Sequence, residues 1–187
     1  MKKIIIFLIT LLLILTSCIK KRIEESSNSE IRNGIVYILD EDKPYTGILT
    51  TKYKNGQLQF ELQYKNGKEE GIEKSYYENG QLQIKAMAKN GKLNGKYRSY
   101  YENGQLQIEM SYKDGKQEGL AQSYYENGKL QIEAVYKNDE LNGLKKIYHE
   151  NGIIWSEVNY KDGKEISPVK WYNKKGIECE NYVTSLE

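Results

Sequence analysis

The chain contains 187 residues, and its 28 lysines and arginines nearly balance 26 aspartates and glutamates, for a formal net charge of +2 at pH 7. A chain so close to neutrality gives no electrostatic case for binding nucleic acid, because such binding depends on a surplus of Lys and Arg over the phosphates they neutralise. One histidine and two cysteines also leave few candidates for a metal site or a catalytic nucleophile.

The amino-terminal segment has the order of a bacterial export signal. Lys2 and Lys3 precede an apolar stretch over residues 4–15, which is too short to span a bilayer comfortably. The sequence Leu15-Thr16-Ser17-Cys18 then resembles the lipobox of bacterial lipoproteins. The resemblance implies diacylation of the Cys18 thiol and cleavage just before it, so residues 1–17 are predicted to be a signal peptide. A plain secretory signal followed by an unrelated cysteine is the alternative.

Lipidation at Cys18 predicts a chain anchored to a membrane, at the outer membrane or the cell surface in a Gram-negative host. Removal of residues 1–17 would bring the net charge to zero, which gives no electrostatic case for anionic lipid either. Cys179 would be the only remaining thiol, so neither an internal disulfide nor a cysteine metal site is expected. Residues 18–30 are polar and non-periodic, which predicts a flexible tether. Residues 31–46 are predicted to form an amino-terminal capping strand.

Glycine-containing pairs recur along the chain with a strict period of 24 residues. One series comprises Asn55-Gly56, Asn79-Gly80, Asn103-Gly104, Asn127-Gly128 and Asn151-Gly152. An interleaved series comprises Asn66-Gly67, Asn90-Gly91, Asp114-Gly115, Asn138-Asp139 and Asp162-Gly163. A third comprises the single glycines Gly47, Gly71, Gly95, Gly119 and Gly143. The pattern predicts a tandem array over residues 47–166.

Each repeat is predicted to contain two antiparallel strands and two tight turns. Asn-Gly flanked by alternating residues favours a type I′ turn, in which both central residues have positive φ. With such two-residue turns, Tyr77 should oppose Leu82, Tyr101 should oppose Leu106, and Gly95 should face Ala86. The lone glycine would then leave room for a neighbouring aromatic ring.

Alternation along the strands predicts two different faces. Leu, Ile and the second tyrosine of each Tyr-Tyr pair form an apolar face, whereas Gln, Glu and Lys occupy the other face together with the first tyrosines. These first tyrosines are Tyr76, Tyr100, Tyr124, Tyr148 and Tyr172. No segment has helical periodicity, so the expected fold is all-β: an elongated, single-layer antiparallel β-meander built from tandem 24-residue hairpin repeats. Residues 167–187 are predicted to be a degraded repeat that caps the carboxyl end, where Pro168 suits an edge.

The segment Tyr76-Tyr77-Glu78-Asn79-Gly80-Gln81-Leu82 and its copies resemble MORN-type repeats, especially the variant found in the YwqK family of toxin–antitoxin antitoxins. The resemblance covers residues 44–182. It implies protein scaffolding or proximity to membranes and phosphoinositides, and the antitoxin family implies neutralisation of a partner protein. The predicted export to a membrane conflicts with the cytoplasmic location of an antitoxin.

The sequence indicates no catalytic residues, no metal ligands and no cofactor. His149 occupies the position of Tyr77, Tyr101 and Tyr125, so we interpret it as a repeat variant and not as a base. The recurrent glutamates lie in equivalent environments, whereas acid–base catalysis needs two carboxylates in different ones. The glycines all suit hairpins, so no loop is left to cradle a phosphate.

We therefore expect a non-catalytic, membrane-anchored module that binds or scaffolds an unidentified protein through the five first tyrosines. The alternatives are an antitoxin or immunity protein that neutralises a toxin, and a surface protein that binds lipid head groups or glycans. Exposed edge strands also permit end-to-end self-association.

Overall fold

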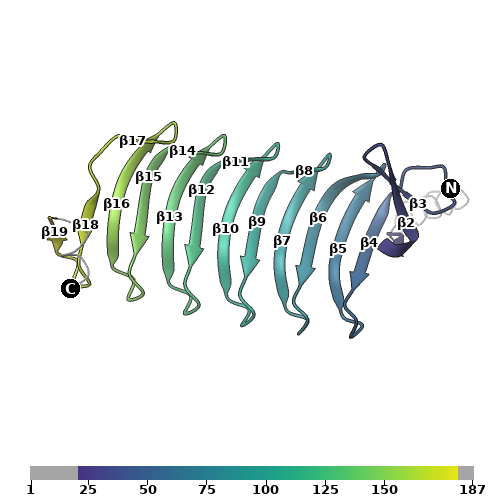
Figure 1. Cartoon of the computed structure of the whole chain (residues 1–187), viewed down its shortest axis with the longest axis horizontal. Helices are drawn as coiled ribbons and strands as arrows, with labels where there is room; N and C mark the ends of the chain where they lie inside the picture. The colour runs from purple at the N-terminus through teal and green to yellow at the C-terminus, as the bar shows by residue number, and fades with distance from the viewer. Residues whose placement is uncertain (1–20, 181–187) are drawn as a thin grey trace, which may run out of the picture.

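A computed structural model describes residues 21–180. The predicted signal peptide, the lipidation site Cys18 and the last seven residues lie outside the described residues. Seventeen strands join in one long sheet, with a separate two-stranded sheet at its amino-terminal end. Figure 1 shows a single elongated layer whose strands run across the long axis, with residues 21 and 180 at opposite ends of the sheet. The predicted all-β, single-layer meander of hairpin repeats is confirmed.

The amino-terminal end comprises β1 (Ile23–Glu25), the 3-10 helix η1 (Ser26–Asn28), β2 (Ser29–Arg32) and β3 (Ile35–Ile38). The long strands of the array are β4 (Gly47–Lys52), β5 (Leu58–Lys65), β6 (Lys68–Tyr76), β7 (Leu82–Lys89), β9 (Gly95–Tyr100), β10 (Leu106–Lys113), β12 (Gly119–Tyr124), β13 (Leu130–Lys137), β15 (Gly143–Tyr148) and β16 (Ile154–Lys161). Short strands precede the return strands: β8 (Lys92–Leu93), β11 (Lys116–Gln117), β14 (Glu140–Leu141) and β17 (Lys164–Glu165). The sheet ends with β18 (Lys170–Tyr172) and β19 (Glu178–Cys179).

The long strands follow one another across the sheet in chain order, each antiparallel to the next. Every repeat therefore contacts mainly the repeats before and after it, as in other repeat proteins. None of the helices among residues 21–180 is both long and apolar enough to cross a membrane.

The two turn series have different geometries. In the series that includes Asn66-Gly67 and Asn90-Gly91, both central residues have positive φ, which confirms the predicted type I′ turns. In the other series only the glycine has positive φ, 85° at Gly80. There the Gly80 N–H donates to the Tyr77 carbonyl at 2.9 Å and the Tyr77 N–H donates to the Gln81 carbonyl at 2.8 Å. This is a three-residue loop with a glycine bulge, so the type I′ prediction is wrong for this series.

The side chain of the loop asparagine stabilises the three-residue loop. Asn79 Oδ1 accepts a hydrogen bond from the Gln81 N–H at 2.9 Å, and Gly80 alone adopts the left-handed conformation. The extra loop residue moves the register, so Leu82 pairs with Tyr76 and not with Tyr77, and Leu106 pairs with Tyr100.

The predicted contact between Gly95 and Ala86 is also wrong. Ala86 pairs with Glu73, whereas Gly95 pairs with Tyr112 on its other side. Gly95 has φ +124°, and a Cβ there would lie 3.3 Å from the Met87 Cβ. The glycine therefore marks an interruption between β8 and β9, and it does lie opposite an aromatic ring.

The predicted tether at residues 18–30 is partly structured. Strand β1 pairs in parallel with β4, with Ile23 opposite Ile48, and the Ile48 N–H donates to the Arg22 carbonyl at 2.8 Å. The backbone groups of an edge strand need partners, and β1 supplies them for β4. The described part of the segment thus belongs to the sheet.

The predicted capping strand at residues 31–46 is instead a hairpin of β2 and β3, with Asn33-Gly34 as its turn. Val36 and Ile38 pack with Tyr45 and Leu49 in the hydrophobic core cluster at this end. The hairpin covers the start of the array because a single-layer sheet cannot bury its own apolar side chains.

Candidate functional site

The five first tyrosines form one row across the sheet, here called the tyrosine row: Tyr76, Tyr100, Tyr124, Tyr148 and Tyr172. They end β6, β9, β12, β15 and β18, and the first four pair with an apolar residue at the start of the next strand. Successive members are two strands apart, or about 10 Å. All five are half-buried, so each presents part of its ring to solvent.

Ten polar residues oppose one another across successive strands in what we call the central row. In sheet order they are Glu61, Lys74, Lys85, Arg98, Glu109, Gln122, Glu133, Lys146, Glu157 and Lys170. The Tyr124 hydroxyl donates to Gln122 Oε1 at 3.0 Å, and the Tyr172 hydroxyl donates to Glu157 Oε1 at 3.0 Å. The tyrosine row therefore lies on the face that carries the charges, as the alternation predicts.

Charged side chains of this face form ion pairs, both within the central row and beside it. Lys74 Nζ lies 3.0 Å from Glu61 Oε1, and Lys96 Nζ lies 2.8 Å from Glu109 Oε1. Hydrogen bonds from Lys96 and Arg98 lower the pKa of Glu109, and burial raises the pKa of Tyr124, with the nearby Glu109 carboxylate adding to the shift. At neutral pH this face thus combines ionised side chains with neutral tyrosine hydroxyls.

The second tyrosines have a different, structural role. Each donates its hydroxyl to a backbone carbonyl of the next repeat, as does Tyr53, which follows Lys52 at the equivalent position. The distance is 2.7 Å from Tyr53 to Tyr76, Tyr77 to Tyr100, Tyr101 to Tyr124 and Tyr125 to Tyr148. We call this set of contacts the hydroxyl ladder. His149 continues it, with Nε2 3.1 Å from the Tyr172 carbonyl oxygen. The interpretation of His149 as a variant of the tyrosine position is confirmed.

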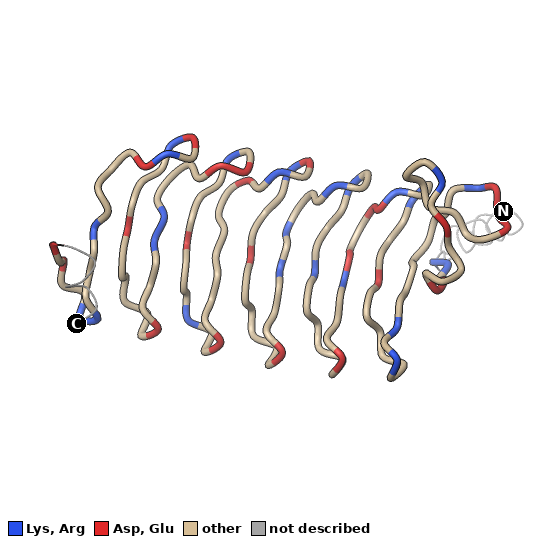
Figure 2. Tube along the Cα trace, in the orientation of Figure 1, with Lys and Arg blue, Asp and Glu red and all other residues tan. Residues whose placement is uncertain are grey.

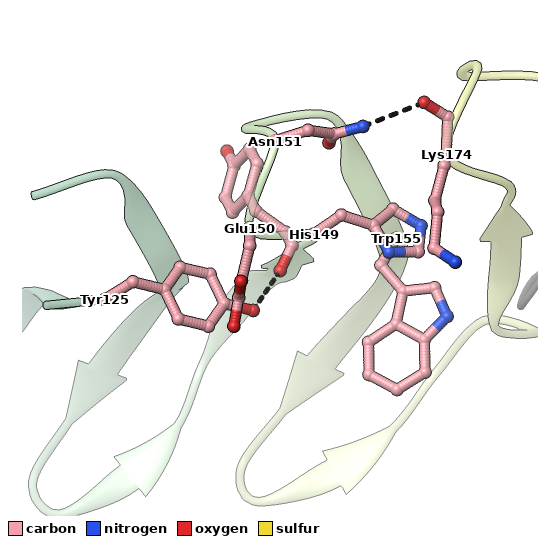
Figure 3. A pocket seen from close by; sticks show the side chains of 7 residues that line it. Tyr125, His149, Glu150, Asn151, Trp155 and Lys174 are labelled. Atoms are coloured by element: carbon pink, nitrogen blue, oxygen red, sulfur yellow. Dashed lines mark hydrogen bonds between the residues drawn. The ribbon is translucent and has the colours of Figure 1, made fainter. Parts of the chain in front are cut away.

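The last repeat also carries an open cleft of about 440 Å³ that the sequence analysis missed. Figure 3 shows Tyr125, His149, Trp155 and Lys174 around it, with the Asn151 amide donating to the Lys174 carbonyl. The His149 and Trp155 rings are 5.8 Å apart, and Trp155 is 5.8 Å from Trp171. The signal was present in the sequence, because Trp155 stands where earlier repeats have Gln83, Gln107 and Gln131.

Among residues 21–180, no group of three His, Cys, Asp or Glu side chains is arranged to hold a metal ion. Cys179 is half-buried in the last repeat, with Sγ 3.3 Å from the Ile177 carbonyl. The glutamates of the central row bond to lysine, arginine, glutamine or tyrosine side chains. The charged face therefore presents a regular array of tyrosine rings and charged side chains.

Fold and surface together define a repeat protein with an extended single-layer sheet and a lengthwise row of tyrosines. The family model described as the MORN repeat variant matches residues 45–66, 69–90, 93–114, 117–138 and 141–162, more than half of the chain. The chain belongs to the MORN repeat variant family. Such repeats typically serve in binding and scaffolding and are generally not enzymes. No curated protein sequence matches the chain.

Proposed function

We propose that the chain is a non-catalytic protein-binding or scaffolding module that uses the tyrosine row as its contact surface. The observation that carries the proposal is the repetition of half-buried tyrosines on the charged face. Tyrosine is enriched in protein interfaces because its ring buries a large area while its hydroxyl still makes hydrogen bonds. The family's usual role in binding supports the same function.

Membrane display through a lipid on Cys18 is the second part of the proposal. The described chain starts beside β1 at one end of the sheet, and the array extends away from that end (Figure 1). A lipid joined shortly before β1 would therefore hold one end of the sheet near the bilayer. Metabolic labelling with a palmitate analogue tests this part, because label should enter wild type and be absent from Cys18→Ser.

The contact surface is tested by site-specific photo-crosslinking in the native host. A photoreactive phenylalanine at Tyr100 should crosslink to a defined protein, and Tyr76→Ala with Tyr124→Ala should abolish the crosslink. The same probe at Tyr136, which pairs with Gly119, leaves the tyrosine row intact and serves as the control. Unchanged crosslinking in the double tyrosine variant, with its melting temperature preserved, would show that the surface is wrong.

A further inference from the structure

Lys85 reverses the sign of charge at one position of the central row. The equivalent positions in the other repeats are Glu61, Glu109, Glu133 and Glu157. Together with Lys85, these positions are spaced by 24 residues. Figure 2 shows the result as a positively charged segment in the middle of β7, where β5, β10, β13 and β16 are negative. The other repeats therefore offer an internal comparison, because four of the five equivalent positions carry a glutamate.

The reversal places three cations side by side. Lys85 pairs directly with Lys74 on β6 and with Arg98 on β9. Directly opposed residues have Cβ atoms only about 5 Å apart, and like charges so placed destabilise a sheet. Elsewhere in the row a glutamate occupies the position of Lys85. Glu109 accepts a hydrogen bond from Arg98, Glu133 accepts one from Gln122, and Glu157 lies 3.8 Å from Lys170.

The outer two cations already have partners. Lys74 bonds to Glu61 at 3.0 Å, and Arg98 bonds to Glu109. Lys85 makes no ion pair within the described part of the chain, although it is half-buried between them. Lys85 thus places a positive charge between two other cations, at a position where the other repeats have a carboxylate. Repulsion between the three cations disfavours this arrangement.

We propose that Lys74, Lys85 and Arg98 form a binding site for a carboxylate side chain of a partner protein. A carboxylate from outside would replace the missing glutamate and accept hydrogen bonds from neighbouring cations, as Glu109 does from Lys96 and Arg98. The proposal deepens the proposed function, on which it rests, by naming the chemistry of the partner: an acidic segment that crosses β6, β7 and β9.

The surroundings favour an acidic peptide over a densely charged polyanion. Glu61 and Glu109 close the basic stretch on both sides, so positive charge extends over only three strands, or about 10 Å. These two carboxylates would repel the neighbouring phosphates of a membrane or a nucleic acid.

Apolar and aromatic groups border the same site. Met87 is 46 % exposed two residues along β7, and Tyr76 and Tyr100 lie two residues from Lys74 and Arg98. Their ring faces and the methionine side chain suit apolar residues that lie beside the acidic ones on the same face of the partner segment.

The test measures fluorescence anisotropy of a labelled peptide rich in glutamate and leucine, titrated with the full chain in non-ionic detergent. Wild type should bind, and Lys85→Glu should weaken binding at least tenfold, or about 1.4 kcal/mol. Lys89→Glu is the matched control, because it makes the same charge change on the same strand at an exposed position, and its affinity should stay within about twofold of wild type. The melting temperature of Lys85→Glu should equal or exceed that of wild type, since the new glutamate faces Lys74 and Arg98.

Equal affinity of wild type and Lys85→Glu would overturn the proposal, as would equal binding of a peptide with glutamine in place of glutamate. Lys85-dependent binding to vesicles containing phosphatidylglycerol, with no binding of the peptide, would also overturn it. The parent proposal fails separately: the tyrosine variants would then keep their crosslinked partner whatever the result at Lys85.

Discussion

Single side chains join one repeat to the next at the hydroxyl ladder. Each second tyrosine reaches a carbonyl 23 residues further along the chain, and the donor–acceptor distance is 2.7 Å in all four cases. The carbonyl belongs to a residue of the tyrosine row, so the ladder also positions the backbone from which that row projects. Removal of one hydroxyl should therefore weaken the contact between repeats without changing the exposed face.

Tyr101→Phe tests the ladder at its centre. The Tyr124 carbonyl would lose its side-chain donor, which should lower the free energy of unfolding by about 1 kcal/mol. Tyr100→Phe is the control, because the Tyr100 hydroxyl makes no hydrogen bond within residues 21–180 and should change stability by less than about 0.5 kcal/mol. Urea denaturation followed by circular dichroism measures both, and equal effects would argue against the ladder.

At the scale of elements, the amino-terminal hairpin is held against the first type I′ turn of the array. The Val36 N–H donates to the Gly67 carbonyl at 3.0 Å, and the Gly67 N–H donates to the Tyr45 carbonyl at 2.7 Å. A Cβ on Gly67 would clash with Ile35 Cγ2. The same turn in the next repeat, at Gly91, has open space around the glycine.

Alanine substitutions at these two glycines separate turn strain from docking of the hairpin. Gly67 and Gly91 have nearly the same φ, +73° and +74°, so alanine should cost about 1–2 kcal/mol of left-handed strain at each. Gly67→Ala should cost about 1–3 kcal/mol more, because its methyl group would displace β3. Thermal unfolding of both variants checks the difference, and equal losses would mean that the hairpin contributes little to stability.

The array was predictable because its determinants are local and repeated. Alternation and the 24-residue period are enough to place the tyrosine row on the charged face. The loop at Tyr77–Gln81 was not predictable from its Asn-Gly pair, because the same dipeptide forms a two-residue type I′ turn at Asn66-Gly67. The structure of β1 also escaped prediction, since its polar sequence is ordered by pairing with β4 and not by a hydrophobic pattern of its own. The sign reversal at Lys85 was visible in the period, but only the register shows that its neighbours are Lys74 and Arg98.

At the scale of the whole molecule, the sheet is a linear sequence of equivalent units. The chain order of the strands equals their order in the sheet, so removal of a complete period should leave the same kinds of contact on both sides of the junction. Stability in such an array is approximately a sum of unit and nearest-neighbour contributions. The length of the molecule should then depend on the number of repeats, while the structure of each repeat stays the same.

Deletion of residues 117–140 tests this directly. The deletion joins Lys116 to Leu141, which lies one period after Gln117, and brings Lys146 into the position that Gln122 has opposite Glu109. The shortened full chain should fold with an unchanged circular dichroism spectrum per residue, a lower free energy of unfolding and a maximum dimension shorter by about 10 Å, the width of two strands. Small-angle scattering in the same detergent measures the shortening. Because Lys74, Lys85 and Arg98 remain, the deletion variant should bind the acidic peptide like wild type, whereas an unfolded deletion variant would show that the repeats depend on more than their neighbours.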